Sequence, residues 1–214
     1  MTPFQLHECG EEQLQTLWFR GGFPRAYLAA TDEDSLLWRR SYIQTFLERD
    51  LSLLGFHLSP QDMRRLWMML AHYHGNILNY AELGRSLSVS DMTIRRHIDI
   101  LQGVFMVRVL KPWFANIHKR QIKSPKLFIR DSGLLHTLLD LDLTQVPMHP
   151  KIGASWEGFA LEEIIRFHQI LPEDAYFWST TGEAELDLFF TYSCLWFGEL
   201  LQVKSDDATT SVKT

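Results

Sequence analysis

Four side chains near the C-terminal end have the types and spacing of a metal-dependent hydrolytic site. Asp187 lies on one predicted strand, and Gln202 and Lys204 lie two positions apart on the next strand. Residues two apart share one face of a strand, and Glu157 comes from a helix predicted just before these strands. Carboxylate oxygens at such a site would hold Mg²⁺, which activates water, while the lysine helps to neutralise charge. Asp187 is the predicted metal ligand, and Mg²⁺ is the cofactor that the site would need.

This arrangement resembles that of nucleases of the PD-(D/E)xK type, with one departure. In those nucleases an Asp opens a hairpin and an acid-x-Lys pair follows on the next strand, whereas here the pair reads Gln202-Val-Lys204. Because Gln202 is neutral, the site has one negative charge fewer with which to hold a hard cation. Only ten residues follow Lys204, so the sheet of such a fold would be incomplete. The nuclease-like site is therefore expected to be degenerate, and the alternative is an ordinary half-buried hairpin with a few surface acids.

A second candidate site lies in residues 79–110, whose pattern predicts two short helices across a tight turn, followed by an apolar strand. Leu83 and Leu87 give the first helix an apolar face, and Ser90 is suited to cap the second helix. This layout is typical of a winged helix-turn-helix. In a nucleic-acid reader the outward positions of the second helix contact phosphates and base edges. The candidates on that helix are Thr93, Arg95 and Arg96.

Charge is segregated along the chain in a way that favours a local phosphate-binding face. The net charge is −5, yet the segment from Ile100 to Arg130 holds seven basic residues and no acidic one. The rest of the chain carries 14 basic and 26 acidic residues, a net charge of −12. A positive segment on an otherwise acidic protein attracts phosphates. A basic run can also be a solvated face or bind an acidic protein surface, and winged helices also dock proteins. The DNA-binding candidates in this run are Lys119, Arg120 and Lys123.

The first part of the chain looks helical and supplies no chemistry of its own. Thr31 opens a helix in the manner of a capping box, and Trp38, Tyr42 and Phe46 follow at i, i+4 spacing. This aromatic stripe is predicted to be either core or a docking face. A further helix is predicted to begin at Ser59 and to serve as the first helix of the winged module.

The expected fold is α+β and mainly helical, in three parts. Residues 1–58 are predicted to be a helical linker or docking segment, and residues 59–125 a winged helix-turn-helix. Residues 126–214 are predicted to form a partial nuclease-like α/β unit. Its helices are expected to begin at Asp131 and at Gly153, and strands follow the second of them.

Composition excludes several other classes of protein. A chain of 214 residues with 46% hydrophobic content can bury one large core or two small ones. It has no apolar stretch of membrane-spanning length and no signal-like start, which predicts a cytoplasmic protein without a membrane partner. Cys9 and Cys194 lie far apart and give no support for a structural zinc. His72 and His74 lie two apart on a predicted helix and are interpreted as ordinary helix-end histidines.

Several short blocks occur in the same order as in one known family. They are Trp18-Phe-Arg-Gly-Gly-Phe-Pro24, Tyr42 to Asp50, the helix-turn-helix, Lys126 to Leu134, Trp156-Glu-Gly-Phe159 and Glu185-Leu-Asp187. Together they resemble DUF4143, a family of unknown function found at the C-terminal end of many prokaryotic AAA-type ATPases. The resemblance implies a winged helix followed by a nuclease-like domain, with an AAA-type ATPase domain as partner in cis or in trans.

Two features of that family are not found in this sequence. No Gly-x-x-x-x-Gly-Lys-[Ser/Thr] loop occurs, so the chain is expected to have no ATPase activity of its own. The family's last segment, after the acid-x-Lys strand, does not match the final ten residues, which suggests a chain truncated at its C-terminus.

Three functions then compete, with the oligomeric state left open. The favoured one is a DNA-binding accessory module of an AAA-type ATPase. The next is a protein docking module for an ATPase domain, which would bind through Trp38, Tyr42 and Phe46. The third is a degenerate metal-dependent nuclease.

Overall fold

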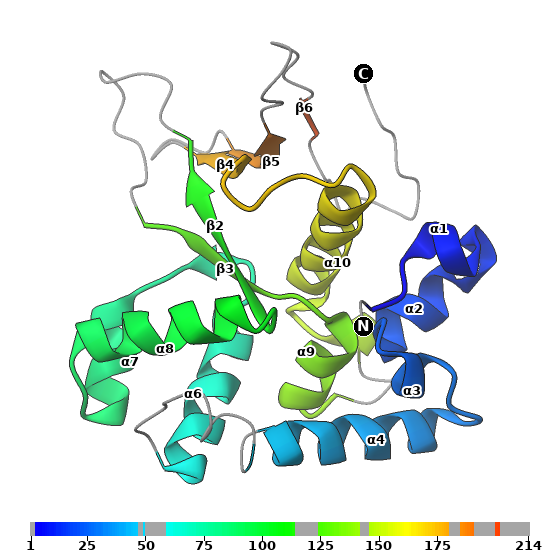
Figure 1. Ribbon diagram of the computed structural model, residues 1–214, viewed down its shortest axis with the longest axis horizontal. Coiled ribbons are helices and arrows are strands. Elements are labelled where there is room, and N and C mark those ends of the chain that lie inside the picture. Colours follow the sequence, from blue (N-terminus) through cyan, green and yellow to red (C-terminus); the bar gives the residue numbers. More distant parts are fainter. Residues whose placement is uncertain are drawn as a thin grey trace.

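The fold is α+β, as the sequence predicts, and among the residues that the structure describes the helices are arranged around one six-stranded mixed sheet (Figure 1). The computed structural model describes residues 3–46, 49, 59–113, 124–141, 146–179, 185–190 and 200–201. The α-helices are α1 (Leu6–Cys9), α2 (Leu14–Arg20), α3 (Pro24–Tyr27), α4 (Asp32–Thr45), α6 (Pro60–Tyr73), α7 (Tyr80–Leu87), α8 (Asp91–Gly103), α9 (Ser132–Leu138) and α10 (Ile152–Phe167). Two short 3₁₀ helices are η1 (Glu11–Gln13) and η3 (Val146–Met148). No helix within these ranges is both long and apolar enough to cross a membrane.

The sheet joins the middle of the chain to its C-terminal part. Its strands are β1 (Asn76–Ile77), β2 (Val107–Pro112), β3 (Lys126–Ile129), β4 (Ala175–Ser179), β5 (Glu185–Phe190) and β6 (Leu200–Leu201). They lie in the order β1-β3-β2-β4-β5-β6, and all neighbours are antiparallel except the parallel pair β2 and β4. Because β3 pairs with both β1 and β2, the predicted boundary before residue 126 falls inside one sheet. The three-part division of the chain stays a prediction.

Local capping signals define the helix starts that the sequence predicts. The hydroxyls of Thr31, Ser59 and Ser90 each accept the backbone N–H three residues further on and so cap α4, α6 and α8. The predicted helix at Asp131 is also confirmed, because its carboxylate caps α9. The helix predicted from Gly153 begins one residue earlier.

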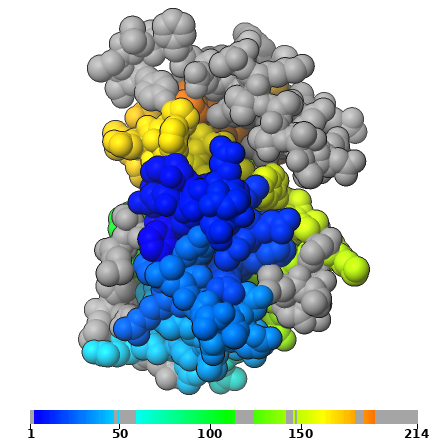
Figure 2. All heavy atoms as spheres, turned by 90° about the vertical axis from the view of Figure 1, so that its right-hand side faces the viewer, coloured from blue at the N-terminus to red at the C-terminus, as the bar shows by residue number. Residues whose placement is uncertain are grey.

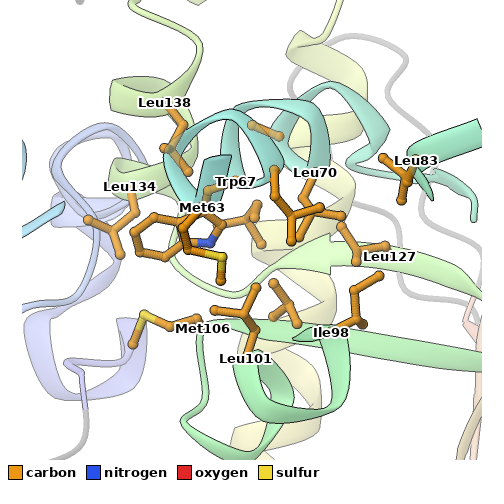
Figure 3. Packing of buried hydrophobic residues seen from close by; sticks show 14 of the residues in the cluster. Met63, Trp67, Leu70, Leu83, Ile98, Leu101, Met106, Leu127, Leu134 and Leu138 are labelled. Atoms are coloured by element: carbon orange, nitrogen blue, oxygen red, sulfur yellow. The ribbon is translucent and has the colours of Figure 1, made fainter. Parts of the chain in front are cut away.

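The larger hydrophobic core fills the space between α6, α8, α9 and one face of the sheet. Figure 3 shows its side chains meeting around Trp67, which is 1% exposed. The labelled members include Met63, Trp67 and Leu70 of α6, Ile98 and Leu101 of α8, Leu127 of β3, and Leu134 and Leu138 of α9. This core contains the apolar faces that the sequence assigns to the helix-turn-helix.

A smaller core lies on the other face of the sheet, under α10. It contains Phe128 of β3, Leu161 and Ile165 of α10, and Phe177 and Phe190 of β4 and β5. Because Phe128 faces this core while its two neighbours in β3 face the larger one, β3 is buried on both sides. A strand that is buried on both faces shows no alternation of apolar and polar residues. β3 therefore contributes side chains to both hydrophobic cores.

The aromatic stripe of α4 is partly interior, because Phe46 is buried while Trp38 and Tyr42 are half-buried. Trp38 stacks on Tyr42, and Tyr42 stacks on Phe46, with ring centroids 5.2 and 6.0 Å apart. Phe23 closes one end of this row and Trp67 of α6 closes the other. Phe46 belongs to the larger core, and a docking role for the half-buried rings of Trp38 and Tyr42 stays a prediction.

Gly21 and Gly22 form a turn that packs against the start of α9. The Asp131 carboxylate accepts the backbone N–H groups of Leu134 and Gly22, both at 2.8 Å. Gly21 has a φ of +79°, and a Cβ atom there would lie 2.2 Å from Asp131 Oδ1. Only glycine satisfies both the conformation and the space at this position.

The N-terminal segment is attached to α10. Arg166 of α10 donates to the backbone carbonyl of Phe4, and Glu163 accepts the N–H of Leu6 at 2.7 Å. In Figure 2 the N-terminal helices, in dark blue, accordingly cover the side of the molecule between α10, in yellow, and α4, in lighter blue.

His74 is a buried structural residue, which corrects its interpretation as an ordinary helix-end histidine. The Ile129 N–H donates to Nδ1 at 2.9 Å, so the ring proton sits on Nε2, which donates to the Ala154 carbonyl at 2.9 Å. His74 thereby bridges β3 and α10. Burial lowers its pKa to about 3, although the bond to Ala154 opposes that shift.

Candidate nucleic-acid interface and carboxylate cluster

The helices α7 and α8 cross at a tight turn, as the sequence predicts. Leu83 and Leu87 of α7 and Ile94 of α8 are buried together in the larger core. Gly84 allows the close approach, because a Cβ atom there would lie 2.7 Å from the backbone carbonyl oxygen of Val89 in the turn. This packing fixes α8 with its opposite face toward solvent.

The exposed face of α8 carries two arginines. Arg95 and Arg96 are both exposed, and so are Met92 and Asp99. Thr93 is only half-buried, and its hydroxyl lies 2.8 Å from that of Ser90 in the cap of the helix. Two of the three predicted contact residues of this helix therefore point outward, and the third takes part in capping.

Arg95 is held against the neighbouring helix. Its guanidinium carbon lies 3.9 Å from the centre of the Tyr80 ring, at the first turn of α7, in cation–π geometry. Tyr80 is half-buried, and burial raises the pKa of its hydroxyl while Arg95 acts in the opposite direction.

The basic stretch between Ile100 and Arg130 is not a continuous surface, contrary to the idea of a single phosphate-binding face. Arg108, Lys126 and Arg130 are engaged in ion pairs with residues of α10, and the first two are almost fully buried. Lys111 of β2 is exposed. The remaining predicted contacts, Lys119, Arg120 and Lys123, lie outside the described residues, in the connection from β2 to β3.

The carboxylate of Glu162, in α10, forms ion pairs with Arg108 of β2 and with Arg130, which follows β3. Arg108 donates to both carboxylate oxygens, and Arg130 Nε donates to Oε2 at 3.0 Å. The side chain of Glu162 is 4% exposed. Burial alone would raise the pKa of this carboxyl, but the two guanidinium groups outweigh burial and hold the pKa below its usual value.

The predicted pair Glu157 and Asp187 does come together, around a lysine that sequence reasoning missed. Lys126 Nζ lies 2.6 Å from a Glu185 oxygen, 3.2 Å from a Glu157 oxygen and 3.6 Å from an Asp187 oxygen. The side chain of Lys126 is 7% exposed. These four residues, the Lys126 cluster, join β3, α10 and β5.

The ammonium group of Lys126 lies within 4 Å of an oxygen of each of the three carboxylates. In the part of the chain that the structure describes, no three His, Cys, Asp or Glu side chains are grouped so that they could hold a metal. The predicted partners Gln202 and Lys204 lie outside that part. The metal role of Asp187 thus stays a prediction, and the described geometry is that of an ion-pair cluster.

The pKa values of Glu157 and Lys126 are both raised in the Lys126 cluster. Burial raises the pKa of Glu157 to about 7, with Asp187 and Glu185 adding to the shift and Lys126 opposing it. Burial would lower the pKa of Lys126, but the carboxylates outweigh it and raise that pKa. The cluster therefore keeps its lysine charged while Glu157 takes up a proton near neutrality.

Replacing Lys126 with methionine is expected to lower the free energy of unfolding by about 2 kcal/mol, because the carboxylates lose their cation. The loss should be larger at ~pH 8.5 than at ~pH 5.5, since a protonated Glu157 needs no counter-charge. Urea unfolding at both pH values measures it. The same change at exposed Lys111 is the control, and equal losses for the two variants would contradict this role of Lys126.

The sequence holds weak signals for the residues that were missed. Lys126 opens an otherwise apolar strand, and Glu162 lies three residues from both Phe159 and Ile165 on the buried face of α10. A charged residue on an apolar face indicates a buried ion pair. The identity of the partner could not be read from either pattern.

The comparisons with known proteins place the chain in a family. A domain of unknown function, DUF8612, matches residues 11–145, which include η1 to α9 and thus the helix-turn-helix. Two similar proteins are uncharacterized protein Mb2031c of Mycobacterium bovis and uncharacterized protein Rv2008c of Mycobacterium tuberculosis. Each is 48% identical over 194 residues, which cover 90% of this chain and 44% of the relative. No solved structure matches.

The comparisons correct the resemblance that the sequence suggested. The matching family is DUF8612 and not DUF4143, and the names of the two relatives give no link to an ATPase. The resemblance to DUF4143 rested on short blocks, and the match over more than half of the chain overturns it. The chain therefore belongs to the family of the domain of unknown function DUF8612.

Proposed function

We propose that residues 59–125, together with β3, form a winged helix that binds duplex DNA through α8. The observation that carries the proposal is the pair of exposed arginines, Arg95 and Arg96, on the second helix of the helix-turn-helix. In such modules the second helix enters the major groove, where arginine is the commonest reader of guanine edges.

The order of elements supports the winged-helix part of the proposal. The chain runs α6, β1, α7, α8, β2 and β3, and the three strands lie antiparallel in the order β1-β3-β2. Three helices with a small antiparallel sheet behind them are the layout of this module, and the connection from β2 to β3 is the position of the wing. That connection carries Lys119, Arg120 and Lys123.

Charge supports the choice of partner. Residues 59–125 contain ten Lys and Arg against four Asp and Glu, a net charge of +6, while the rest of the chain has 11 against 22. Like charges repel the acidic part of the chain from DNA, and the basic segment gains affinity by releasing counterions from phosphates. The segregation therefore favours contact through the module alone.

The two alternatives receive less support. Docking through Trp38, Tyr42 and Phe46 would use rings of limited access, because Phe46 is buried against Trp67 and the other two are half-buried against Phe23. A degenerate nuclease would need the carboxylates that Lys126 already neutralises. An AAA-type ATPase domain as partner stays a prediction.

Fluorescence anisotropy of labelled duplex DNA at ~50 and ~200 mM salt tests the proposal, since phosphate contacts lose affinity steeply between these concentrations. An Arg95→Ala/Arg96→Ala double variant should weaken binding and reduce the slope of log K against log salt by about 1 to 2. The control is Arg25→Ala/Arg40→Ala, which removes two exposed arginines outside the module. Absence of binding by the wild type at ~50 mM salt would overturn the proposal.

A further inference from the structure

We infer that Tyr80 is a positioning residue that holds Arg95 for a contact with a backbone phosphate and leaves Arg96 to read the bases. The inference rests on the proposed binding of duplex DNA. The observation behind it is the guanidinium of Arg95, 3.9 Å from the centre of the Tyr80 ring.

The contact ties α8 to the first turn of α7. Tyr80 is the first residue of α7, next to the capping residue Asn79. The first helix of a helix-turn-helix crosses the DNA backbone while the second enters the major groove. A guanidinium drawn toward the first turn of α7 is therefore drawn toward phosphates and away from the base edges.

Stacking leaves the arginine able to bind. A guanidinium that lies flat on an aromatic ring contacts it with its face, and its N–H groups remain at the edge, where they fit phosphate oxygens. The ring also restricts the rotamers of Arg95 before DNA arrives, so less conformational entropy is lost on binding. Tyr80 can do this because it is half-buried and thus fixed in place.

Arg96 is placed differently. One residue further along a helix points about 100° away, so Arg96 does not face Tyr80. It is exposed, and no ion pair or ring contact is recorded for it within the described residues. It lies four residues after exposed Met92, on the same face of α8. Met92 and Arg96 therefore form the part of α8 that is free to meet base edges, with an apolar group beside a guanidinium.

The test compares Tyr80→Leu with Tyr80→Phe, since phenylalanine keeps the ring that leucine removes. Tyr80→Leu is expected to weaken binding of a labelled duplex by about two- to fivefold at ~50 mM salt, whereas Tyr80→Phe retains the wild-type affinity. The effect should be equal for two duplexes of unrelated sequence, because phosphate contacts carry no sequence information. Arg96→Ala should instead change the ratio of affinities for the two duplexes.

A double-variant cycle separates positioning from a merely structural role. In an Arg95→Ala background, Tyr80→Leu should cause no further loss of affinity, because the arginine that it positions is absent. An equal loss with and without Arg95 would overturn the inference while leaving DNA binding intact. Failure of the wild type to bind either duplex would instead overturn the proposed function, so the two failures are distinguishable.

Discussion

Replacing Glu162 with glutamine is expected to lower the free energy of unfolding by about 3–5 kcal/mol, since breaking a buried ion pair leaves an uncompensated charge. The substitution keeps the volume of the side chain and removes only its charge. Arg108, 8% exposed, and Arg130, 21% exposed, would then lose the carboxylate that both of them contact. A glutamine oxygen can accept one of their hydrogen bonds but cannot neutralise two guanidinium groups.

Urea unfolding followed by circular dichroism measures the effect as a shift of the midpoint at unchanged slope. The matched control is Glu173→Gln, an exposed carboxylate at which the same change of charge should cost about 0.5 kcal/mol or less. Combining Glu162→Gln with Arg108→Met should cost less than the sum of the two single changes, because each one removes a charge that the other leaves unpaired. Additive losses would contradict the idea of a coupled ion-pair group.

Features set by neighbouring residues could be predicted from the sequence. The starts of α4, α6 and α8 follow from Thr31, Ser59 and Ser90, whose capping partners lie three residues away. The apolar spacing of Leu83 and Leu87 likewise identified the buried face of α7. Such signals are local, and tertiary packing here agrees with them.

Features set by distant residues could not be predicted. Arg108 and Arg130 were counted as part of a basic surface, yet their partner Glu162 lies 54 and 32 residues away along the chain. A charge count treats every lysine and arginine as exposed, whereas Arg108 and Arg130 pair with the buried Glu162. The resemblance to DUF4143 was wrong because it rested on short blocks of sequence, whereas the match to DUF8612 extends over residues 11–145.

The approach of Glu157 to Asp187 could be predicted from the sequence, whereas the metal role of Asp187 stays a prediction. Glu157 and Asp187 do converge, since an oxygen of each lies within 4 Å of Lys126 Nζ. The cation between them is Lys126, from a strand that the sequence argument had not connected with either residue. The spacing of residues in a hairpin predicts which carboxylates share a face. It does not predict that Lys126, from β3, contacts them.

His74 is expected to make the protein sensitive to acid. Its ordinary pKa of 6.5 falls to about 3 in the folded state because of burial, so between these values the unfolded chain binds more protons than the folded one. Stability contributed by the neutral ring is therefore present above pH 6.5 and is lost as the pH falls toward 3. The loss is about 1.4 kcal/mol for each pH unit.

A His74→Asn variant isolates this contribution. The asparagine oxygen can accept the Ile129 N–H, while the bond to Ala154 is lost, so a cost of about 1–3 kcal/mol is expected at neutral pH. On acidification to ~pH 4.5 the wild type should lose about 3 kcal/mol relative to the variant, which then becomes at least as stable as the wild type, because the variant has no ring to protonate. The control His72→Asn, at an exposed position, should follow the wild-type profile. Parallel profiles of the His74 variant and the wild type would contradict the linkage.

The pH dependence of the wild type alone would not isolate His74, because Glu157 changes the free energy of unfolding with pH in the opposite direction. The pKa of Glu157 is raised from 4.5 to about 7, so between these values the folded state holds more protons at this carboxyl and stability falls as the pH rises. The slopes due to His74 and Glu157 therefore oppose each other between pH 4.5 and 6.5. A flat wild-type profile in that window would conceal two large and opposite contributions. Subtracting the profile of His74→Asn removes the part due to Glu157, which both proteins share.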